Sequence, residues 1–181
     1  MSAARDGYRE QPAGGPALRS DVVDVFVFRQ AQAAHAGDAP TVAFLQLKRA
    51  TEPLIDTWQP VMGHVEKGET SLVCAARELR EETGLTSENA ALLGAWALEQ
   101  THPFFVAAIN CIVLSPRFAV EVSADWSPTL NEEHCAYRWV GASEIEAVFF
   151  WPGQKAVCRE ILAEIVNPAA LARDQLRVVL P

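Results

Sequence analysis

The hydrophobic positions of this chain change their period several times, and each change predicts an element. Residues 21–29 (DVVDVFVFR) alternate and are rich in Val and Phe, and residues 41–48 (TVAFLQLK) repeat the pattern. Alternation in β-branched and aromatic residues is typical of strands. Gly, Asp and Pro lie between the two runs, so we expect them to pair as a hairpin.

The clearest helical pattern lies at residues 69–83. Four apolar residues recur there at helical spacing, namely Leu72, Ala75, Ala76 and Leu79. Thr70 or Ser71 is suited to cap the start, and Gly84 supplies a stop signal. We therefore expect one well-delimited helix.

The remaining pattern mixes strands and helices. Strand-like runs cover residues 91–99, 104–114, 118–122 and 136–140. Pro103 and Pro116 mark breaks between them, and helical patterns follow at residues 143–149 and 154–166. This order predicts an α/β fold, a mixed β-sheet flanked by helices, with the last helix packed on the sheet.

The length of 181 residues favours a single domain. Residues 1–20 are rich in Ala, Gly and Pro without periodicity, so we expect a disordered N-terminal arm there. The folded domain is predicted at residues 21–167. Residues 168–181 form a short apolar tail, and the sequence does not decide whether this tail docks.

The amino-acid composition restricts the classes of molecule that this protein is expected to bind. Apolar residues make up 50% and charged residues 21%, as in ordinary folded domains. The formal net charge of −8 argues against binding a nucleic acid polymer or an anionic membrane, because both need a basic surface. An acidic protein that handles phosphates would have to recruit cations. The sequence leaves open whether the protein is a monomer or a homodimer.

The four cysteines form no CxxC pair, so we expect reduced thiols that act as small hydrophobes. No run approaches the roughly 20 apolar residues that span a bilayer. The N-terminal residues lack the apolar core of a secretory signal. We therefore expect a cytoplasmic protein.

Three glutamates carry the most informative chemistry. Glu78, Glu81 and Glu82 are spaced i, i+3 and i+4, which places them on one helical face. Three like charges repel one another there, so a cation that neutralises them is a reasonable inference. An all-oxygen cluster suits Mg²⁺ or Mn²⁺. We call these three glutamates the acidic stripe. A solvated acidic face of the helix is the simpler alternative when the stripe is considered without its flanking residues.

The flanking residues favour the metal site. Gly63, Gly68 and Gly84 provide backbone freedom for a tight loop before the helix and a sharp exit after it. Arg77 is placed to pair with Glu69 and to fix the loop against the helix.

At this point the segment resembles the Nudix box: Gly, five residues, Glu, seven residues, then Arg-Glu-aliphatic-any-Glu-Glu-any-Gly-aliphatic. Its positions are filled here by Gly63, Glu69, Arg77, Glu78, Leu79, Glu81, Glu82, Gly84 and Leu85. The resemblance implies an α/β/α sandwich and a pyrophosphohydrolase that acts on a small-molecule phosphoanhydride.

The resemblance also implies roles for the box residues. Glu78, Glu81 and Glu82 would bind the divalent cations, and Glu69 and Arg77 would support that site. The cations would offset the charge of a diphosphate and lower the pKa of the attacking water.

A carboxylate must accept the proton of that water. Glu78 and Glu82 are candidates within the helix. The later segment LNEEHCAYRWV resembles an acidic loop that reaches back to the metals in several Nudix enzymes, and there we favour Glu133 over Glu132. A charged surface turn is the alternative for this segment.

Further residues are candidates for binding the substrate. Lys48 and Arg49 are suited to clamp distal phosphates, and Trp58 to stack on a planar ring, although core packing also explains a tryptophan. Gly63 and His64 lie where a phosphate would pass, although a solvent-exposed turn histidine is an equal explanation for His64.

The substrate is read by loops outside the box. WQPVMGHVEKGET, EEHCAYRWV and WPGQKAVCREIL together resemble the dihydroneopterin triphosphate pyrophosphohydrolases, so a pterin or nucleoside triphosphate is the first expectation. A dinucleoside polyphosphate is the alternative. A non-catalytic Nudix regulatory module or an acidic protein stabilised by calcium are rival interpretations; the complete box disfavours the first, and Arg77 with the glycines the second.

Overall fold

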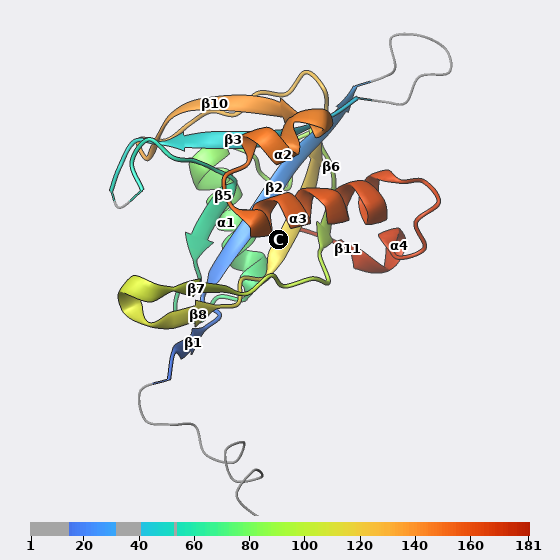
Figure 1. Ribbon diagram of the computed structural model, residues 1–181. Coiled ribbons are helices and arrows are strands. Elements are labelled where there is room, and N and C mark those ends of the chain that lie inside the picture. The colour runs from blue at the N-terminus through green and yellow to red at the C-terminus, as the bar shows by residue number, and fades with distance from the viewer. Residues whose placement is uncertain (1–14, 32–40, 53) are drawn as a thin grey trace, which may run out of the picture.

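The computed structural model describes residues 15–31, 41–52 and 54–181 (Figure 1). The strands are β1 (Ala17–Arg19), β2 (Val22–Ala31), β3 (Thr41–Arg49), β4 (Trp58–Gln59), β5 (Val61–His64), β6 (Leu92–Ala97), β7 (Phe104–Val106), β8 (Cys111–Val113), β9 (Arg117–Val122), β10 (His134–Gly141) and β11 (Arg177–Val178). The helices are α1 (Ser71–Thr83), α2 (Ile145–Val148), α3 (Pro152–Glu160) and α4 (Arg173–Leu176), with short 3₁₀ turns η2 (Ala107–Ile109) and η3 (Ala142–Glu144) and a π-helical turn η4 (Ile161–Val166).

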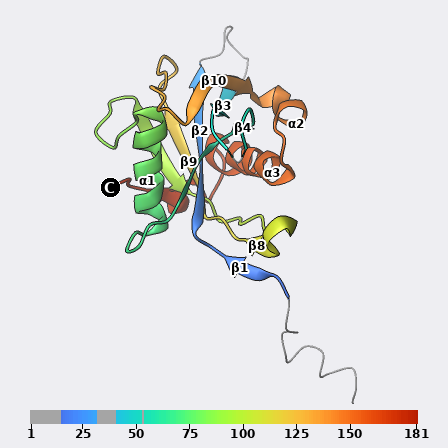
Figure 2. The same ribbon diagram turned by 90° about the vertical axis from the view of Figure 1, so that its left-hand side faces the viewer.

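The main sheet is mixed, as the sequence predicts. Its order is β10-β3-β2-β9-β6-β11, with β4 paired to β3 and β5 paired to β2. The strands β2 and β9 run parallel, whereas the expected hairpin of β2 and β3 is antiparallel. Helix α1 covers one face and α2 with α3 the other, which makes an α/β/α sandwich (Figure 2).

Two apolar cores fill the sandwich, one on each side of the sheet. Val23, Val25 and Val27 of β2 pack toward α1, whereas Phe26 and Phe28 pack toward α3. Because β2 is a central strand buried on both faces, it presents apolar side chains in both directions. The sheet therefore holds α1 rigidly against β2 and β5.

Residues 104–114 form two strands instead of the single strand predicted. The strands β7 and β8 are joined by the 3₁₀ turn η2 and by Asn110, which adopts a left-handed φ of 46°. That turn reverses the chain, and apolar periodicity does not reveal it. Residues 17–19 also depart from the predicted arm, because β1 pairs in parallel with β8 and completes a small second sheet.

The C-terminal residues dock on the sandwich, which the sequence left open. Strand β11 pairs with β6, and Leu180 is buried in the core beside α1. The long C-terminal helix predicted at residues 154–166 starts at Pro152 and continues from α3 into the π-helical turn. In the described part of the chain, no helix is both long and apolar enough to cross a membrane.

Candidate active site

The predicted central helix is confirmed as α1, and its ends are fixed by the expected residues. The Thr70 hydroxyl accepts a hydrogen bond from the Val73 amide at 3.3 Å, which caps the start. Gly84 follows with a left-handed φ of 72°, and its amide donates to the Arg80 carbonyl. The acidic stripe therefore lies on a helix with a defined register.

Arg77 ties the loop before the helix to the helix itself. Its guanidinium donates to both oxygens of Glu69, at 2.8 and 3.1 Å, and to the His64 carbonyl at 2.9 Å. Glu69 also accepts from the Glu66 amide at 2.8 Å. The hydrogen bonds from Arg77 hold the pKa of Glu69 down to about 2. The expected Glu69 to Arg77 pair is therefore present.

Gly63 lies on β5 directly against Glu78. A Cβ atom at position 63 would sit 1.8 Å from the Glu78 Oε1 atom, closer than any side chain tolerates. Gly63 pairs in register with Val23, which fixes its backbone. The glycine therefore lets the Glu78 carboxylate lie against the strand.

The three stripe glutamates have different surroundings. Glu82 is 2% exposed and Glu78 is 9% exposed, whereas the Glu81 side chain is 46% exposed. The same Arg77 nitrogen donates to Glu78 at 2.7 Å and to Glu81 at 3.1 Å. Arg77 thus offsets two charges of the stripe, whereas Glu82 forms no ion pair within the described residues and is affected by Arg49 only at longer range.

Glu82 is the group most perturbed by this arrangement. Burial raises its pKa to about 9, and the negative charges of Glu78 and Glu133 add to the rise. Its Oε2 atom has no hydrogen-bond partner among the described residues. Burial also raises the pKa of Glu78, although Arg77 opposes that shift. A positive charge near Glu82, in addition to that of Arg77, would stabilise the ionised forms of Glu78 and Glu82.

Glu133, directly before β10, and Arg49, at the end of β3, lie near the glutamates of α1. The Ala50 amide donates to the Glu133 carbonyl at 2.7 Å, and the Arg49 guanidinium lies 3.7 Å from the Glu133 carboxylate. Both line a cleft of about 400 Å³. The cleft is lined by Val22, Arg49, Leu54, Gln59, Met62, Gly63, His64, Val65, Glu66, Arg77, Glu78 and Glu133.

The side chains fit a divalent cation, although they are not already arranged around one. Within the described residues, no three His, Cys, Asp or Glu side chains form a ready metal cluster. Arg77 occupies oxygens of Glu78 and Glu81, which explains the difference from a preformed site. The unpartnered, buried oxygen of Glu82 beside two further carboxylates is the donor set that a hard cation prefers.

Comparison with known proteins identifies the family. The sequence model of the NUDIX domain matches residues 18–162. The chain belongs to the Nudix hydrolase family. It is therefore a hydrolase that acts on phosphorus-containing acid anhydrides, a pyrophosphatase.

This Nudix hydrolase resembles curated bis(5'-nucleosyl)-tetraphosphatases of the asymmetrical type. The protein from Rattus norvegicus is 32% identical over 123 residues, which cover 68% of this chain and 80% of that protein. The protein from Sus scrofa is 30% identical over 132 residues with the same coverage.

Solved structures show the same fold. A C. elegans Ap4A hydrolase complex has a TM-score of 0.61 at 20% identity and covers 80% of this chain and 96% of its own. The E. coli dihydroneopterin triphosphate pyrophosphohydrolase has a TM-score of 0.57 at 24% identity and covers 77% of this chain and 94% of its own.

Not every predicted residue reaches the cleft of this Nudix hydrolase. Gly63, His64 and Arg49 line it, but Lys48 and Trp58 do not. Lys48 pairs with Asp56 at 2.7 Å, on the face opposite to Arg49, because neighbouring strand residues point to opposite faces. The Trp58 ring is covered by the Arg138 guanidinium at 4.1 Å. Neither residue is among those that line the cleft, and their predicted contact with the substrate stays a prediction.

Sequence reasoning gave no role to three residues near the site, although His134 lies in the acidic loop that it singled out. Gln59 is a 5% exposed polar side chain in the cleft wall, and Met62 lines the cleft and meets Glu82 through its backbone. His134 is 4% exposed, and its Nε2 atom has no partner within the described chain. A polar residue inside a strand-like run was the only signal for Gln59, and nothing in the pattern marks Met62.

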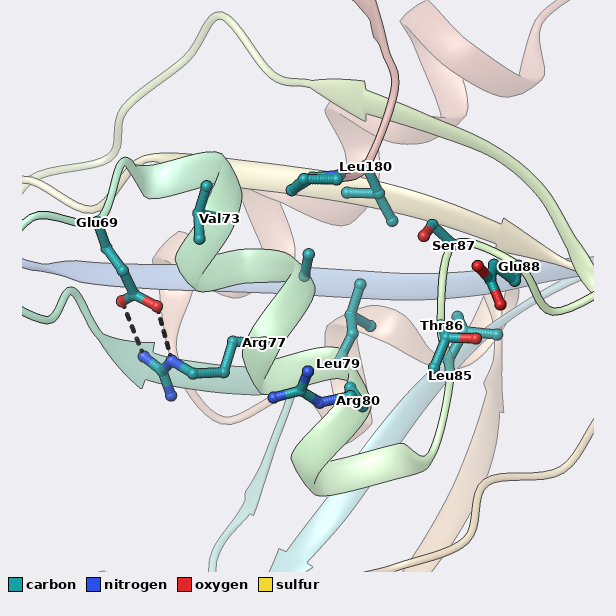
Figure 3. Close-up of a pocket in the computed structure, with 12 residues that line it drawn as sticks. Glu69, Val73, Arg77, Leu79, Arg80, Leu85, Thr86, Ser87, Glu88 and Leu180 are labelled. Atoms are coloured by element: carbon teal, nitrogen blue, oxygen red, sulfur yellow. Dashed lines mark hydrogen bonds and ion pairs between the residues drawn. The ribbon is translucent and has the colours of Figure 1, made fainter.

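A second, larger groove of about 470 Å³ lies on the outer side of α1 (Figure 3). Glu69 and Arg77 bound one end, and Leu180 and the loop with Thr86, Ser87 and Glu88 bound the other. Glu78 and Glu133 line the smaller cleft and not this groove, whereas Glu81 and Glu82 line neither of the two. Size alone therefore does not locate the chemistry, and the smaller cleft is the candidate active site.

Three of the four cysteines are buried, as expected, and Cys135 is exposed; none forms a disulfide in the described chain. Burial raises the pKa of the Cys74 thiol to about 11, although Cys74 lies one helical turn from Arg77. The Cys74 thiol is therefore not placed to act as a nucleophile.

Proposed function

We propose that this Nudix hydrolase uses Mg²⁺ or Mn²⁺ to cleave a dinucleoside polyphosphate asymmetrically. One observation carries the proposal for the site: a buried carboxylate, Glu82, lies beside Glu78 and near Glu133, and one of its oxygens has no hydrogen-bond partner in the part of the chain that the structure describes. The curated relatives, at 30 to 32% identity, support the substrate class.

In this proposal Glu78, Glu81 and Glu82 hold the divalent cations. A bound cation would offset the phosphate charge and lower the pKa of the attacking water. Glu81 is exposed and would have to exchange its contact with Arg77 for the cation. Nudix enzymes generally need such a cation, and an all-oxygen donor set favours Mg²⁺ or Mn²⁺.

The remaining residues position the reactants. Glu133 accepts the proton of the attacking water, because it lies on the cleft wall and faces the stripe glutamates. Arg49 forms an ion pair with Glu133 at 3.7 Å, and the guanidinium donors that do not bond the carbonyls of Thr51 and Glu52 are offered to a phosphate oxygen. Arg77 and Glu69 keep the loop of Gly63 and His64 against the helix, so that the cleft retains its shape.

A substrate panel tests the proposal. The protein is incubated with Mg²⁺ and, in parallel, with a dinucleoside tetraphosphate, nucleoside triphosphates or dihydroneopterin triphosphate, and the products are resolved by chromatography. The proposal is supported if the dinucleoside tetraphosphate yields a nucleoside triphosphate and a nucleoside monophosphate in equal amounts. Efficient release of pyrophosphate from the pterin, with little turnover of the tetraphosphate, would instead assign the second candidate, which the likeness of EEHCAYRWV to the pterin enzymes favours.

The role of Glu133 has a matched control. Glu133→Gln removes the proton acceptor and is expected to lower kcat by about 100-fold or more with little change in KM. Glu132→Gln changes the neighbouring exposed carboxylate by the same chemistry and should retain near-native turnover. Equal kcat values for the two variants would remove Glu133 from the mechanism.

A further inference from the structure

The cleft has an uncharged part that the proposed chemistry does not use. Arg49, Glu78 and Glu133 have roles toward the phosphates, the cations and the attacking water. Leu54 and Gln59 line the same cleft, and neither carries a charge that could offset a phosphate. A nucleotide substrate also contains planar rings, and rings are bound by apolar contact together with a few hydrogen bonds. The uncharged part of the cleft matches that requirement.

The Gln59 amide is nearly buried and unpaired. Its side chain is 5% exposed and makes no hydrogen bond to any other described residue. Unlike the enclosed amide nitrogen of Gln46, its polar atoms keep some contact with solvent. Among the described residues that line the cleft, Gln59 is the only one with a side-chain amide. Because an unpaired polar group in a buried position is costly, Gln59 is suited to a ligand that supplies both a donor and an acceptor.

The sheet places this amide beside the residues that handle the phosphates. Gln59 on β4 pairs with Leu47 on β3, and Arg49 lies two residues further along β3 on the same face. Diagonal neighbours of this kind are within reach of each other's long side chains. Arg49 in turn forms the ion pair with Glu133 at 3.7 Å. A ring bound at Gln59 therefore directly adjoins phosphates bound at Arg49.

A turn at residues 54–57 holds an exposed leucine at the rim of the cleft. Leu54 is 44% exposed, and its carbonyl accepts a hydrogen bond from the Thr57 hydroxyl at 2.6 Å. The Asp56 amide donates to the Arg49 carbonyl at 2.9 Å, and the Asp56 carboxylate pairs with Lys48 at 2.7 Å. Asp56 also adopts a left-handed φ of 65°, a conformation that persists only where the surrounding contacts fix it. The turn therefore presents Leu54 as a fixed apolar surface.

We propose that Leu54 and Gln59 bind the planar ring of an adenine nucleoside, an inference that rests on the proposed function. Leu54 covers a face of the ring, and the Gln59 amide bonds its edge. An amide offers an N–H donor beside a C=O acceptor, which complements the amino group and the adjacent ring nitrogen of adenine. Guanine presents two acceptors at the corresponding edge and matches the amide less well there.

Calorimetric titration in the presence of Mg²⁺ tests the role of Gln59. The two probes are adenosine 5′-monophosphate and purine riboside 5′-monophosphate, which lacks only the amino group. The wild-type protein is expected to bind the adenine nucleotide about tenfold more tightly. Gln59→Leu removes the amide at similar side-chain volume and should bind both nucleotides equally. A wild-type protein that binds neither nucleotide or binds both equally overturns the proposal, as does a preference that persists in Gln59→Leu.

The role of Leu54 has a matched control in the next residue. Leu54→Ala removes contact with the face of the ring and should weaken both nucleotides by about threefold to tenfold. Ile55 is 49% exposed and is not among the residues that line the cleft, so Ile55→Ala should bind both as the wild type does. Circular dichroism checks that each variant is folded. Equal affinities for Leu54→Ala and Ile55→Ala overturn the assignment of Leu54.

Hydrolysis of the dinucleoside tetraphosphate, measured in parallel, separates this inference from the proposed function. Binding of a nucleoside monophosphate does not require turnover. Hydrolysis without the adenine preference overturns the ring site alone. An adenine preference that depends on Gln59, without hydrolysis of the tetraphosphate, supports the ring site and overturns the proposed reaction.

Discussion

Glu82 combines near-complete burial with a carboxylate oxygen that has no hydrogen-bond partner among residues 15–31, 41–52 and 54–181. A buried ionised group without a partner is costly, so the site favours either a proton or a cation. The proton is favoured in the protein alone, as the pKa of about 9 indicates. In the proposed function, a cation that binds the acidic helix therefore displaces the proton of Glu82.

The first prediction concerns the stability of the protein in the presence of a chelator. The ordinary pKa of Glu82 is 4.5 and the folded value is about 9, so between these pH values the folded state binds more protons than the unfolded state. The free energy of unfolding therefore falls as pH rises through this window. Glu82→Gln should flatten the profile. Urea midpoints measured across the window test this; equally steep profiles for the variant and the wild type would contradict it.

The second prediction concerns Gly63→Ala. The added methyl would overlap the Glu78 carboxylate, so that side chain must move away from the strand. We expect kcat/KM to fall by about tenfold to a hundredfold. Gly141→Ala is the control, since its Cβ would meet only the end of the Glu144 side chain, at 3.1 Å. If both variants retain full activity, the position of Glu78 does not depend on Gly63.

At the scale of elements, α1 is held from two sides. The Arg77 guanidinium bonds it to the preceding loop, and Leu180 of the C-terminal tail packs beside it in the core that contains Leu79. The tail reaches it because β11 pairs with β6, the next-to-last strand of the sheet. Helix α1 is thus positioned in part by a segment that is distant in sequence.

The third prediction concerns the tail. Leu180 is 6% exposed in the core cluster that contains Leu79 and Leu85. Leu180→Ala should lower the free energy of unfolding by about 2 kcal/mol, the low end for a buried leucine, because a terminal segment can open locally. Val179→Ala, at an 87% exposed position, should change it by less than about 0.5 kcal/mol. Chemical denaturation measures the free energy of unfolding of both variants. Equal values for the Leu180→Ala and Val179→Ala variants would show that the tail does not stabilise the sandwich.

At the scale of the whole molecule, the net charge of −8 and the acidic cleft act together. The negative field draws cations to the protein and repels a polyphosphate that arrives alone, so the metal complex of the substrate is the species expected to bind.

The fourth prediction follows from this charge balance. If Mg²⁺ binds only the folded state, a Mg²⁺ concentration of ten times its dissociation constant should raise the free energy of unfolding by about 1.4 kcal/mol. The Tm should therefore rise with Mg²⁺ in the wild type and much less in Glu82→Gln. Na⁺ at equal ionic strength controls for screening. An equal rise in both proteins would indicate cation binding away from the stripe.

The sequence by itself determined the local features of this protein. The helix at residues 71–83, its caps and the spacing of Glu78, Glu81 and Glu82 follow from residues close in the chain, so periodicity and the box pattern predicted them. The Glu69 to Arg77 pair was predictable for the same reason.

Only the tertiary structure decided which distant groups meet. Glu133 and Arg49 reach the cleft because β10 pairs with β3, whereas Lys48, one residue away from Arg49, points to the other face. The left-handed turn at Asn110 and the docking of Leu180 are likewise set by contacts between distant segments. Strand pairing and burial are not local properties, so the sequence pattern indicates which residues carry the chemistry but not which of them lie together.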